Sequence, residues 1–124
     1  MLHDYYYTIK NQQTTGDATL FDVALLPDCS VYEGHFPGMP VAPGVCNIQM
    51  IKECVERIAG KPLLLESMTQ CKFVTMITPA QHRALQVRIL STESEDNRLK
   101  VSATIGCDNT DYVIFKGEFL MNKI

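Results

Sequence analysis

The chain has 124 residues, of which 46% are apolar and 20% are charged, and its formal net charge is −3. Such values are typical of a globular protein with a core of its own, and we expect a single domain over residues 1–124. No basic stripe indicates a nucleic-acid partner, no apolar run reaches the roughly 18 residues of a membrane span, and the N-terminus lacks a secretion-signal pattern. We therefore expect a cytoplasmic protein that binds neither nucleic acid nor membrane.

The first third of the chain predicts strands followed by an irregular loop. Tyr5–Lys10 is a candidate N-terminal strand. Ala18–Leu26 is a clearer strand, because its apolar residues fall on one face and Pro27 then interrupts it. From there to Pro43 the chain is rich in proline and glycine, which indicates a loop.

One helix is predicted, over Gly44–Ala59. Pro43 or Gly44 suits a helix start, and Gly60 suits a helix end. Apolar residues spread widely around this helix, and its polar residues gather on one side. These polar residues are Gln49, Lys52, Glu53 and Glu56. We therefore expect a mostly buried helix with one narrow, solvated polar stripe.

Four strands are predicted after the helix. They are Leu63–Val74, Arg83–Leu90, Leu99–Ile105 and a last strand that contains Val113, Phe115 and Phe119. An acidic hairpin loop, Ser91–Asn97, separates the second of these from the third. This order predicts an α+β domain in which an antiparallel sheet packs on one helix.

The cysteines do not indicate a metal site or a disulfide framework. They are Cys29, Cys46, Cys54, Cys71 and Cys107. Their number is odd and no C-x-x-C pair occurs, so we expect reduced, mostly buried thiols. No metal and no cofactor are expected.

The segment around His35 is chemically the most suggestive part of the chain. Pro37 and Pro40 restrict the backbone beside it, so the loop should hold the imidazole in one place as a candidate general base. The N–H groups near Gly44 and Val45 begin the helix without helical partners and could stabilise an oxyanion. Such a pair suits chemistry at the carbon alpha to a carbonyl, although a histidine in such a loop is often purely structural.

The segment GHFPGMPVAPGV, residues 34–45, strongly resembles the signature of the 3-hydroxyacyl-[acyl-carrier-protein] dehydratases of fatty-acid synthesis. Lys72 and Phe73, followed by Pro79, look like a second family segment whose turn has changed here to Ala80–Gln81. The resemblance implies a hotdog fold, in which an antiparallel sheet wraps around one long central helix. It also implies side-by-side dimers, or larger oligomers of dimers, with acyl tunnels at the dimer interface.

The resemblance assigns roles to individual residues. His35 falls at the base that removes the C2 proton of a 3-hydroxyacyl thioester, and the N–H of Gly44 falls where the thioester carbonyl is polarised. The family places a Glu or Asp, contributed by the other protomer, fourteen residues after the histidine, and here that residue is Gln49. An amide can hold the substrate hydroxyl or a water, but it cannot deliver a proton. Glu53, one turn further on, is the candidate substitute acid, unless it simply belongs to the solvated stripe.

Three functions follow as alternatives. The first is a dehydratase-like lyase acting on an acyl thioester of acyl carrier protein. The second is a weakly active partner subunit that completes its site in a heterodimer with an acid-bearing homologue. The third is a hotdog thioesterase or acyl-binding protein.

Substrate and carrier contacts are less specific in the sequence. Phe36, Val45, Ile48 and Phe73 suit a tunnel lining, although core packing explains them equally well. Carrier-protein docking would need a basic patch near the tunnel mouth. The candidates are Lys52, Arg57, Lys61, Lys72, Arg83 and Arg88.

Overall fold

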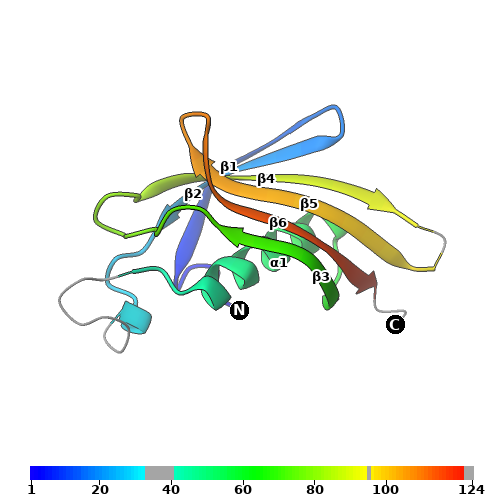
Figure 1. Cartoon of the computed structure of the whole chain (residues 1–124), viewed down its shortest axis with the longest axis horizontal. Helices are drawn as coiled ribbons and strands as arrows, with labels where there is room; N and C mark the ends of the chain where they lie inside the picture. The colour runs from blue at the N-terminus through cyan, green and yellow to red at the C-terminus, as the bar shows by residue number, and fades with distance from the viewer. Residues whose placement is uncertain (33–40, 95, 122–124) are drawn as a thin grey trace.

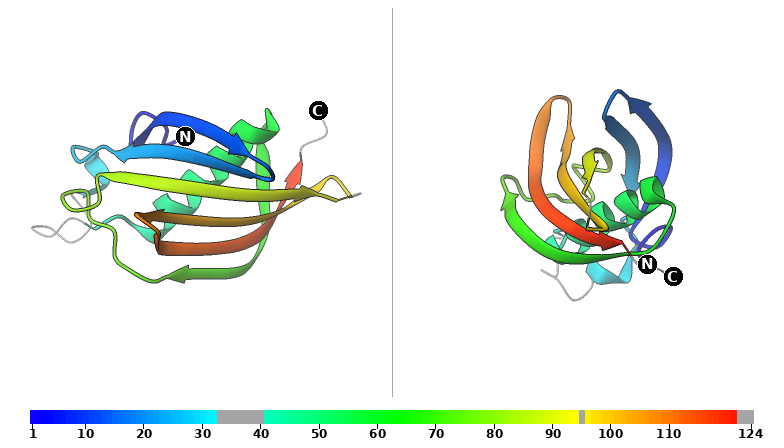
Figure 2. Two further views of the ribbon diagram at one scale, coloured as in Figure 1. Left: turned by 90° about the horizontal axis from the view of Figure 1, so that it is seen from above. Right: turned by 90° about the vertical axis from the view of Figure 1, so that its right-hand side faces the viewer.

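The computed structural model describes residues 1–32, 41–94 and 96–121. Its elements are β1 (Tyr7–Thr15), β2 (Ala18–Leu25), a 3₁₀ turn (Ser30–Tyr32), α1 (Gly44–Ala59), β3 (Leu63–Phe73), β4 (Ala84–Glu93), β5 (Arg98–Cys107) and β6 (Thr110–Met121). Within these residues the strands form one antiparallel, six-stranded sheet in the order β1-β2-β4-β5-β6-β3 (Figure 1). The sheet curves around α1, which lies on its concave side (Figure 2).

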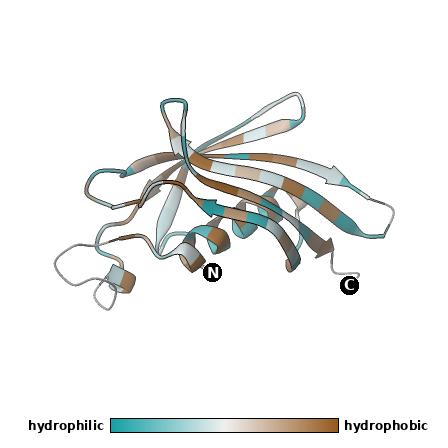
Figure 3. Cartoon of the chain, in the orientation of Figure 1, coloured by the Kyte–Doolittle hydropathy of each residue, from teal (hydrophilic) through white to brown (hydrophobic). Residues whose placement is uncertain are grey.

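The alternation of apolar and polar residues builds the sheet. Leu85, Val87 and Ile89 of β4 are buried and alternate with exposed neighbours. In the register of β4 and β5, Val87 pairs with Ile105 and Ile89 with Ala103, so buried residues face the helix together. Figure 3 shows the resulting alternation of hydrophobic and hydrophilic bands along these strands. The period of two therefore defines the core side of the sheet.

Turn residues with positive φ join the strands tightly. Asp108 and Asn109, between β5 and β6, have φ values of 50° and 65°. Both residue types tolerate the left-handed region, and two such residues in succession match the twist of a hairpin. Gly16 plays the corresponding part between β1 and β2, with a φ of 61°.

The helix has the predicted bounds and 16 residues. Pro43 precedes it in an extended conformation, and Gly60 ends it with a φ of 71° while its N–H donates to the Glu56 carbonyl at 2.8 Å. Met50, Ile51, Cys54 and Val55 are fully buried against the sheet. Val45, at the start of the helix, is 75% exposed and does not join this buried face.

The strand ends differ most from the sequence prediction in β1 and at the end of β4. The first strand begins at Tyr7 and continues to Thr15, because it pairs with β2 along its whole length. β4 continues to Glu93, which pairs with Leu99, so the acidic loop is shorter than predicted. Polar residues such as Gln13 and Thr92 enter strands here because neighbouring strands supply their backbone partners.

The two edges of the sheet differ in chemistry. β1 exposes mainly Asn, Gln and Thr side chains, whereas β3 exposes Leu64, Met68 and Phe73. Only Leu63 of β3 is buried, although the strand has 11 residues. The pairing of β3 with β6 shifts register twice, between Leu65 and Ser67 and between Met68 and Gln70. β3 is therefore an apolar and irregular edge.

Candidate functional site

The predicted histidine lies outside the described residues. His35 and Phe36 belong to residues 33–40, which the structure does not describe. The described site consists of the start of α1, the end of β3 and the polar side of α1.

The start of α1 presents free donors. The Pro43 carbonyl accepts hydrogen bonds from the N–H groups of Cys46 at 3.0 Å and Asn47 at 3.2 Å. Within residues 1–32, 41–94 and 96–121, no hydrogen bond from the N–H of Gly44 or Val45 is found, and no side chain caps the helix. The helix macrodipole adds partial positive charge at this end. Gly44 is thus placed where an anionic oxygen would be stabilised.

Phe73 lies directly against Gly44. A Cβ atom built on Gly44 would stand 2.8 Å from Cζ of Phe73. The space beside the glycine is therefore occupied by an aromatic ring at the end of β3, and the ring is half exposed. The structure brings Gly44 and Phe73 together, with the exposed Val45 next in the helix.

Gln49 and Glu53 form a hydrogen-bonded pair on α1. Nε2 of Gln49 donates to Oε2 of Glu53 at 2.9 Å. The two residues are one helical turn apart, so their side chains lie on the same face. Gln49 is half-buried, but Glu53 is only 6% exposed. The expected position of Glu53 in a solvated stripe was therefore wrong.

The N-terminal segment covers Glu53. Its carboxylate accepts hydrogen bonds from the N–H of Leu2 at 2.7 Å, the N–H of His3 at 2.9 Å and the hydroxyl of Tyr7 at 3.0 Å. Burial by itself raises the pKa of Glu53, but the bonds from Gln49, Leu2, Tyr7 and His3 outweigh it, so the pKa lies below its usual value. Glu53 is therefore ionised at neutral pH.

The sequence did not predict the donors on the N-terminal segment. Their N–H groups have no side-chain signature, and they meet Glu53 only in the folded chain. The sequence held one signal for the burial of Glu53. Glu53 follows Cys46, which is buried, by seven residues, or about two helical turns. That spacing puts Glu53 near the core side of the helix rather than among the exposed residues.

A tyrosine cluster supports the start of α1 from the other side. The Tyr6 hydroxyl donates to Oδ1 of the buried Asn47 at 2.8 Å. The Tyr32 ring lies 6.2 Å from the Tyr6 ring, and its hydroxyl makes no hydrogen bond of normal geometry in the described part of the chain. Burial raises the pKa of Tyr32 to about 12, with the Tyr6 hydroxyl acting in the opposite direction. These groups fix the helix start, which follows the segment that contains His35 in the sequence.

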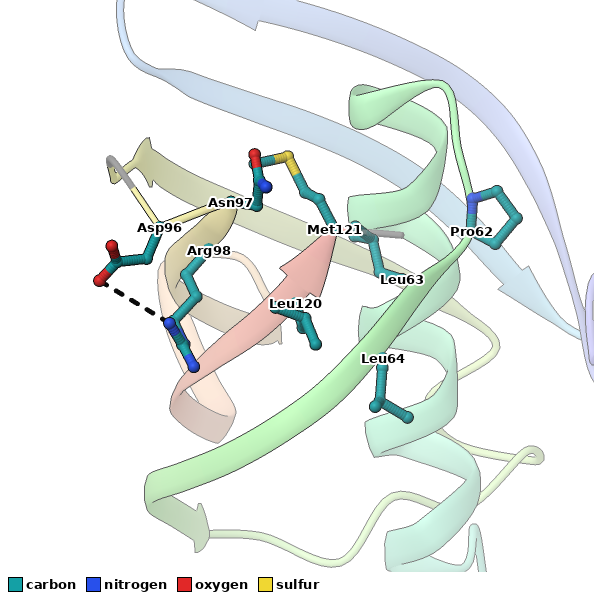
Figure 4. A pocket seen from close by; sticks show the side chains of 8 residues that line it. All are labelled: Pro62, Leu63, Leu64, Asp96, Asn97, Arg98, Leu120 and Met121. Atoms are coloured by element: carbon teal, nitrogen blue, oxygen red, sulfur yellow. Dashed lines mark ion pairs between the residues drawn. The ribbon is translucent and has the colours of Figure 1, made fainter. Parts of the chain in front are cut away.

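Among the hollows on the surface of the described residues, one lies beside the polar side of α1 and another beside the start of β3. The first, here called the Gln49 groove, is lined by Met1, Gln49, Lys52, Glu53, Glu56, Arg57, Lys61 and Pro62. The second is lined by the start of β3 and by residues 96–98 and 120–121, including the ion pair of Arg98 and Asp96 (Figure 4). No residue predicted for the site lines the second hollow. It lies at the far end of β3 from Phe73, about 30 Å along the strand.

The same described residues contain neither a metal-binding cluster nor a membrane-spanning helix. Across the three described ranges, no group of His, Cys, Asp and Glu side chains could hold a metal ion. Cys29, Cys46 and Cys54 are buried, and Cys71 and Cys107 are partly buried. None of the helices in these ranges is long and apolar enough to cross a membrane.

Sequence comparison finds dehydratases. A family model described as ApeI-like, ApeI dehydratase, matches residues 11–118. A relative from Lactiplantibacillus plantarum, the 3-hydroxyacyl-[acyl-carrier-protein] dehydratase FabZ, is 30% identical over 84 residues, which are 62% of this chain and 57% of the relative. The chain spans little more than half the length of this relative and of a second FabZ from Levilactobacillus brevis, to which it is 29% identical.

Structural comparison supports the fold. The dehydratase heterocomplex ApeI:P from Xenorhabdus doucetiae is similar, with a TM-score of 0.71 and 17% identity, over 90% of this chain and 96% of that one. The dehydratase domain from the CurK module of the curacin polyketide synthase has a TM-score of 0.56 and 14% identity, over 99% of this chain and 45% of that one. The predicted hotdog arrangement of one antiparallel sheet and one helix is thereby confirmed, with a helix of 16 residues.

Proposed function

Because the chain belongs to the ApeI-like dehydratase family, we propose that it is a hydro-lyase that removes water from a 3-hydroxyacyl thioester. The observation that supports this most directly is the open start of α1, where the N–H groups of Gly44 and Val45 have no partner in the described residues. They directly follow the segment that contains His35. A donor pair at a helix start can stabilise the enolate oxygen that forms when the C2 proton leaves.

His35 and Gln49 share the remaining chemistry in this proposal. The C2–H bond breaks, its proton passes to the His35 imidazole, and the electron pair moves onto the thioester oxygen as an enolate. The pair then returns to form the C2=C3 double bond as the C3–O bond breaks. Gln49 holds the hydroxyl but has no proton to give. The His35 imidazolium therefore returns the same proton to the departing oxygen, which leaves as water. One histidine thus serves as base and then as acid.

Glu53 has a supporting role rather than that of the substitute acid. Its carboxylate is buried, ionised and already bonded to four donors. A general acid needs a proton to give and a path to the substrate. Glu53 has neither, because its carboxylate is ionised and only 6% of the residue is exposed.

A second copy of the chain completes the site at β3. This edge exposes Leu64, Met68 and Phe73, and the strand has a single buried residue. Pairing β3 with β3 of a copy would cover these side chains and satisfy the free backbone groups of the edge. Phe73 and Val45 would then lie beside the interface. These two residues and Phe36 are our proposed contacts with the acyl chain. The ApeI:P neighbour is a heterocomplex, so a homologue is the other partner that the same edge could accept.

Carrier protein is the proposed donor of the acyl group, and the Gln49 groove is its proposed contact. Lys52, Arg57 and Lys61 line the groove beside Gln49. Glu56, the other acidic residue there, already accepts the N–H of Leu63 at 2.8 Å and lies 3.8 Å from Lys52. Arg57 and Lys61 are exposed and form no ion pair with any described residue, so they are free to meet an acidic partner.

One set of assays tests the proposal. Wild type, His35→Ala and Gln49→Glu are compared for dehydration of a 3-hydroxyacyl thioester and for hydration of the enoyl thioester. We expect activity in the wild type that His35→Ala abolishes, and a gain of about a hundredfold in Gln49→Glu, where a proton donor is restored. A wild type no faster than His35→Ala contradicts the proposal. Release of free thiol in the same assay would instead indicate a thioesterase, and activity that needs an added homologue would indicate a partner subunit.

A further inference from the structure

We propose that Glu53 is a positioning residue that holds the Gln49 side chain with its N–H towards Glu53 and its carbonyl oxygen, Oε1, towards the Gln49 groove. This inference rests on the proposed function, because it assigns Gln49 its manner of contact with the substrate hydroxyl. Gln49 then meets that hydroxyl as a hydrogen-bond acceptor.

The acceptor positions of Glu53 explain the orientation. Oε2 receives the N–H of Leu2 at 2.7 Å and Nε2 of Gln49 at 2.9 Å. Oε1 receives the N–H of His3 at 2.9 Å and the hydroxyl of Tyr7 at 3.0 Å. An ionised carboxylate only accepts hydrogen bonds, so it repels an amide oxygen and selects the amide nitrogen. Four donors on two oxygens hold the carboxylate in a fixed place.

The direction from which each donor comes decides what Gln49 can do. Leu2, His3 and Tyr7 approach Glu53 from the N-terminal segment and β1, whereas Gln49 approaches from the preceding turn of α1. Both Gln49 and Glu53 line the Gln49 groove, but Glu53 is 6% exposed and Gln49 is half-buried. Gln49 is therefore the member of the pair that a bound molecule can reach.

An acceptor at this place favours substrates that carry a hydroxyl group. The 3-hydroxyl donates a hydrogen bond to Oε1 of Gln49. The lone pairs of the hydroxyl oxygen stay free for the proton that His35 returns. An enoyl product lacks this donor, so Gln49 no longer holds the acyl chain once the C3–O bond has broken and the water has formed. The pair thus orients the C3–O bond without taking part in proton transfer.

The same geometry predicts the behaviour of a carboxyl group at position 49. In Gln49→Glu the new carboxyl would face the ionised Glu53 at hydrogen-bonding distance. Two carboxylates so close cannot both stay ionised, so the new group keeps its proton to a higher pH than usual and can still give it to the departing hydroxyl. Its activity should therefore persist to a higher pH than an isolated glutamic acid allows.

Kinetics of Glu53→Gln, with Tyr7→Phe as the matched control, test the positioning role. Tyr7→Phe removes one donor to Glu53 and leaves the contact with Gln49 in place. We expect kcat to fall about tenfold or more in Glu53→Gln with KM nearly unchanged, and to stay near the wild-type value in Tyr7→Phe. Equal kcat values for the two variants, measured at a temperature at which both are folded, would overturn the proposal.

The pH profiles of Gln49→Glu and of Gln49→Glu/Glu53→Gln provide the second test. The alkaline limb of kcat should lie at least one pH unit higher in the single variant than in the double variant. Identical limbs would overturn the proposal.

Nuclear magnetic resonance of the Gln49 side-chain amide is a third test. It can be made on the wild-type protein and does not depend on catalytic activity. One N–H of this amide should exchange its hydrogen slowly with solvent. Its chemical shift should change at acid pH as Glu53 is protonated. A freely exchanging amide that does not titrate would overturn the positioning role, even if dehydration is confirmed. A protected, titrating amide in an inactive wild type would leave the positioning intact and overturn the proposed function instead.

Discussion

The N–H of Leu2 donates to Oε2 of Glu53 at 2.7 Å, although the two residues are 51 positions apart in the chain. This contact attaches the N-terminal segment to the middle of α1. The buried Glu53 carboxylate therefore helps to hold α1, the helix that begins at Gly44, in place.

Glu53 should make stability depend on pH in the acid range. Its pKa is lower in the folded chain than in the unfolded chain, where it is about 4.3. Its contribution is therefore complete above about pH 5 and is lost as the pH falls through the folded pKa. Glu53→Gln should lower the free energy of unfolding at pH 7 by about 1–3 kcal/mol. Urea unfolding between pH 3 and pH 7 would measure it, and a variant with the same pH dependence as the wild type would contradict it.

A methyl group at Gly44 should impair the site more than the fold. In Gly44→Ala the new Cβ would stand 2.8 Å from the Phe73 ring, so the ring must move. We expect activity to fall by roughly a hundredfold while the melting temperature changes little. Gly44→Ala/Phe73→Leu, with a smaller side chain at position 73, should recover part of the activity. Full activity in the single variant would show that the ring is not part of the site.

Tyr6 and Tyr32 offer a matched pair of hydroxyl deletions. Tyr6→Phe removes the donor to Asn47 and leaves a buried amide oxygen unpaired, which should cost about 1–3 kcal/mol. Tyr32→Phe removes a buried hydroxyl that has no hydrogen-bond partner of normal geometry in the described residues, so its effect should be close to zero. Thermal unfolding of both variants would measure the difference. Equal losses of stability would contradict the expectation.

A charge on β3 should disrupt the proposed dimer. Met68→Arg places a cation on the apolar edge, whereas Gln13→Arg makes a comparable change on the polar edge, β1. We expect Met68→Arg to shift the protein towards monomer with a matching loss of activity, and Gln13→Arg to behave as wild type. Sedimentation velocity would report both. A monomeric wild type, or a dimer unaffected by Met68→Arg, would refute the β3 interface.

Reversing charge in the Gln49 groove should affect carrier-linked substrates selectively. Arg57→Glu and Lys61→Glu should raise KM for an acyl group on carrier protein, while KM for the same acyl group on a short thiol stays unchanged. The effect should diminish at high ionic strength, because salt screens exposed charges. Arg88→Glu, on β4 and outside this groove, is the control. Equal effects on both substrates would show that the groove does not bind the carrier.

Much of the fold followed from the sequence because its signals are local. The bounds of α1 were predicted from Pro43 and Gly60, and the structure confirms them. The burial of Glu53 could not be predicted in the same way, because its donors come from residues 2–7. The exposure of Val45 likewise depends on where the helix start lies relative to the sheet. The roles of His35 and Phe36 stay predictions, since both residues lie outside the described part of the chain.

The two register shifts in β3 also bear on aggregation. A long, flat, apolar edge strand is a template on which further chains can add without limit. β3 is apolar, but its irregularities interrupt the row of backbone groups that such growth requires. The opposite edge, β1, is lined mainly by polar side chains. We therefore expect a sheet built in this way to pair with one partner whose irregularities match, and to resist extension into a fibre.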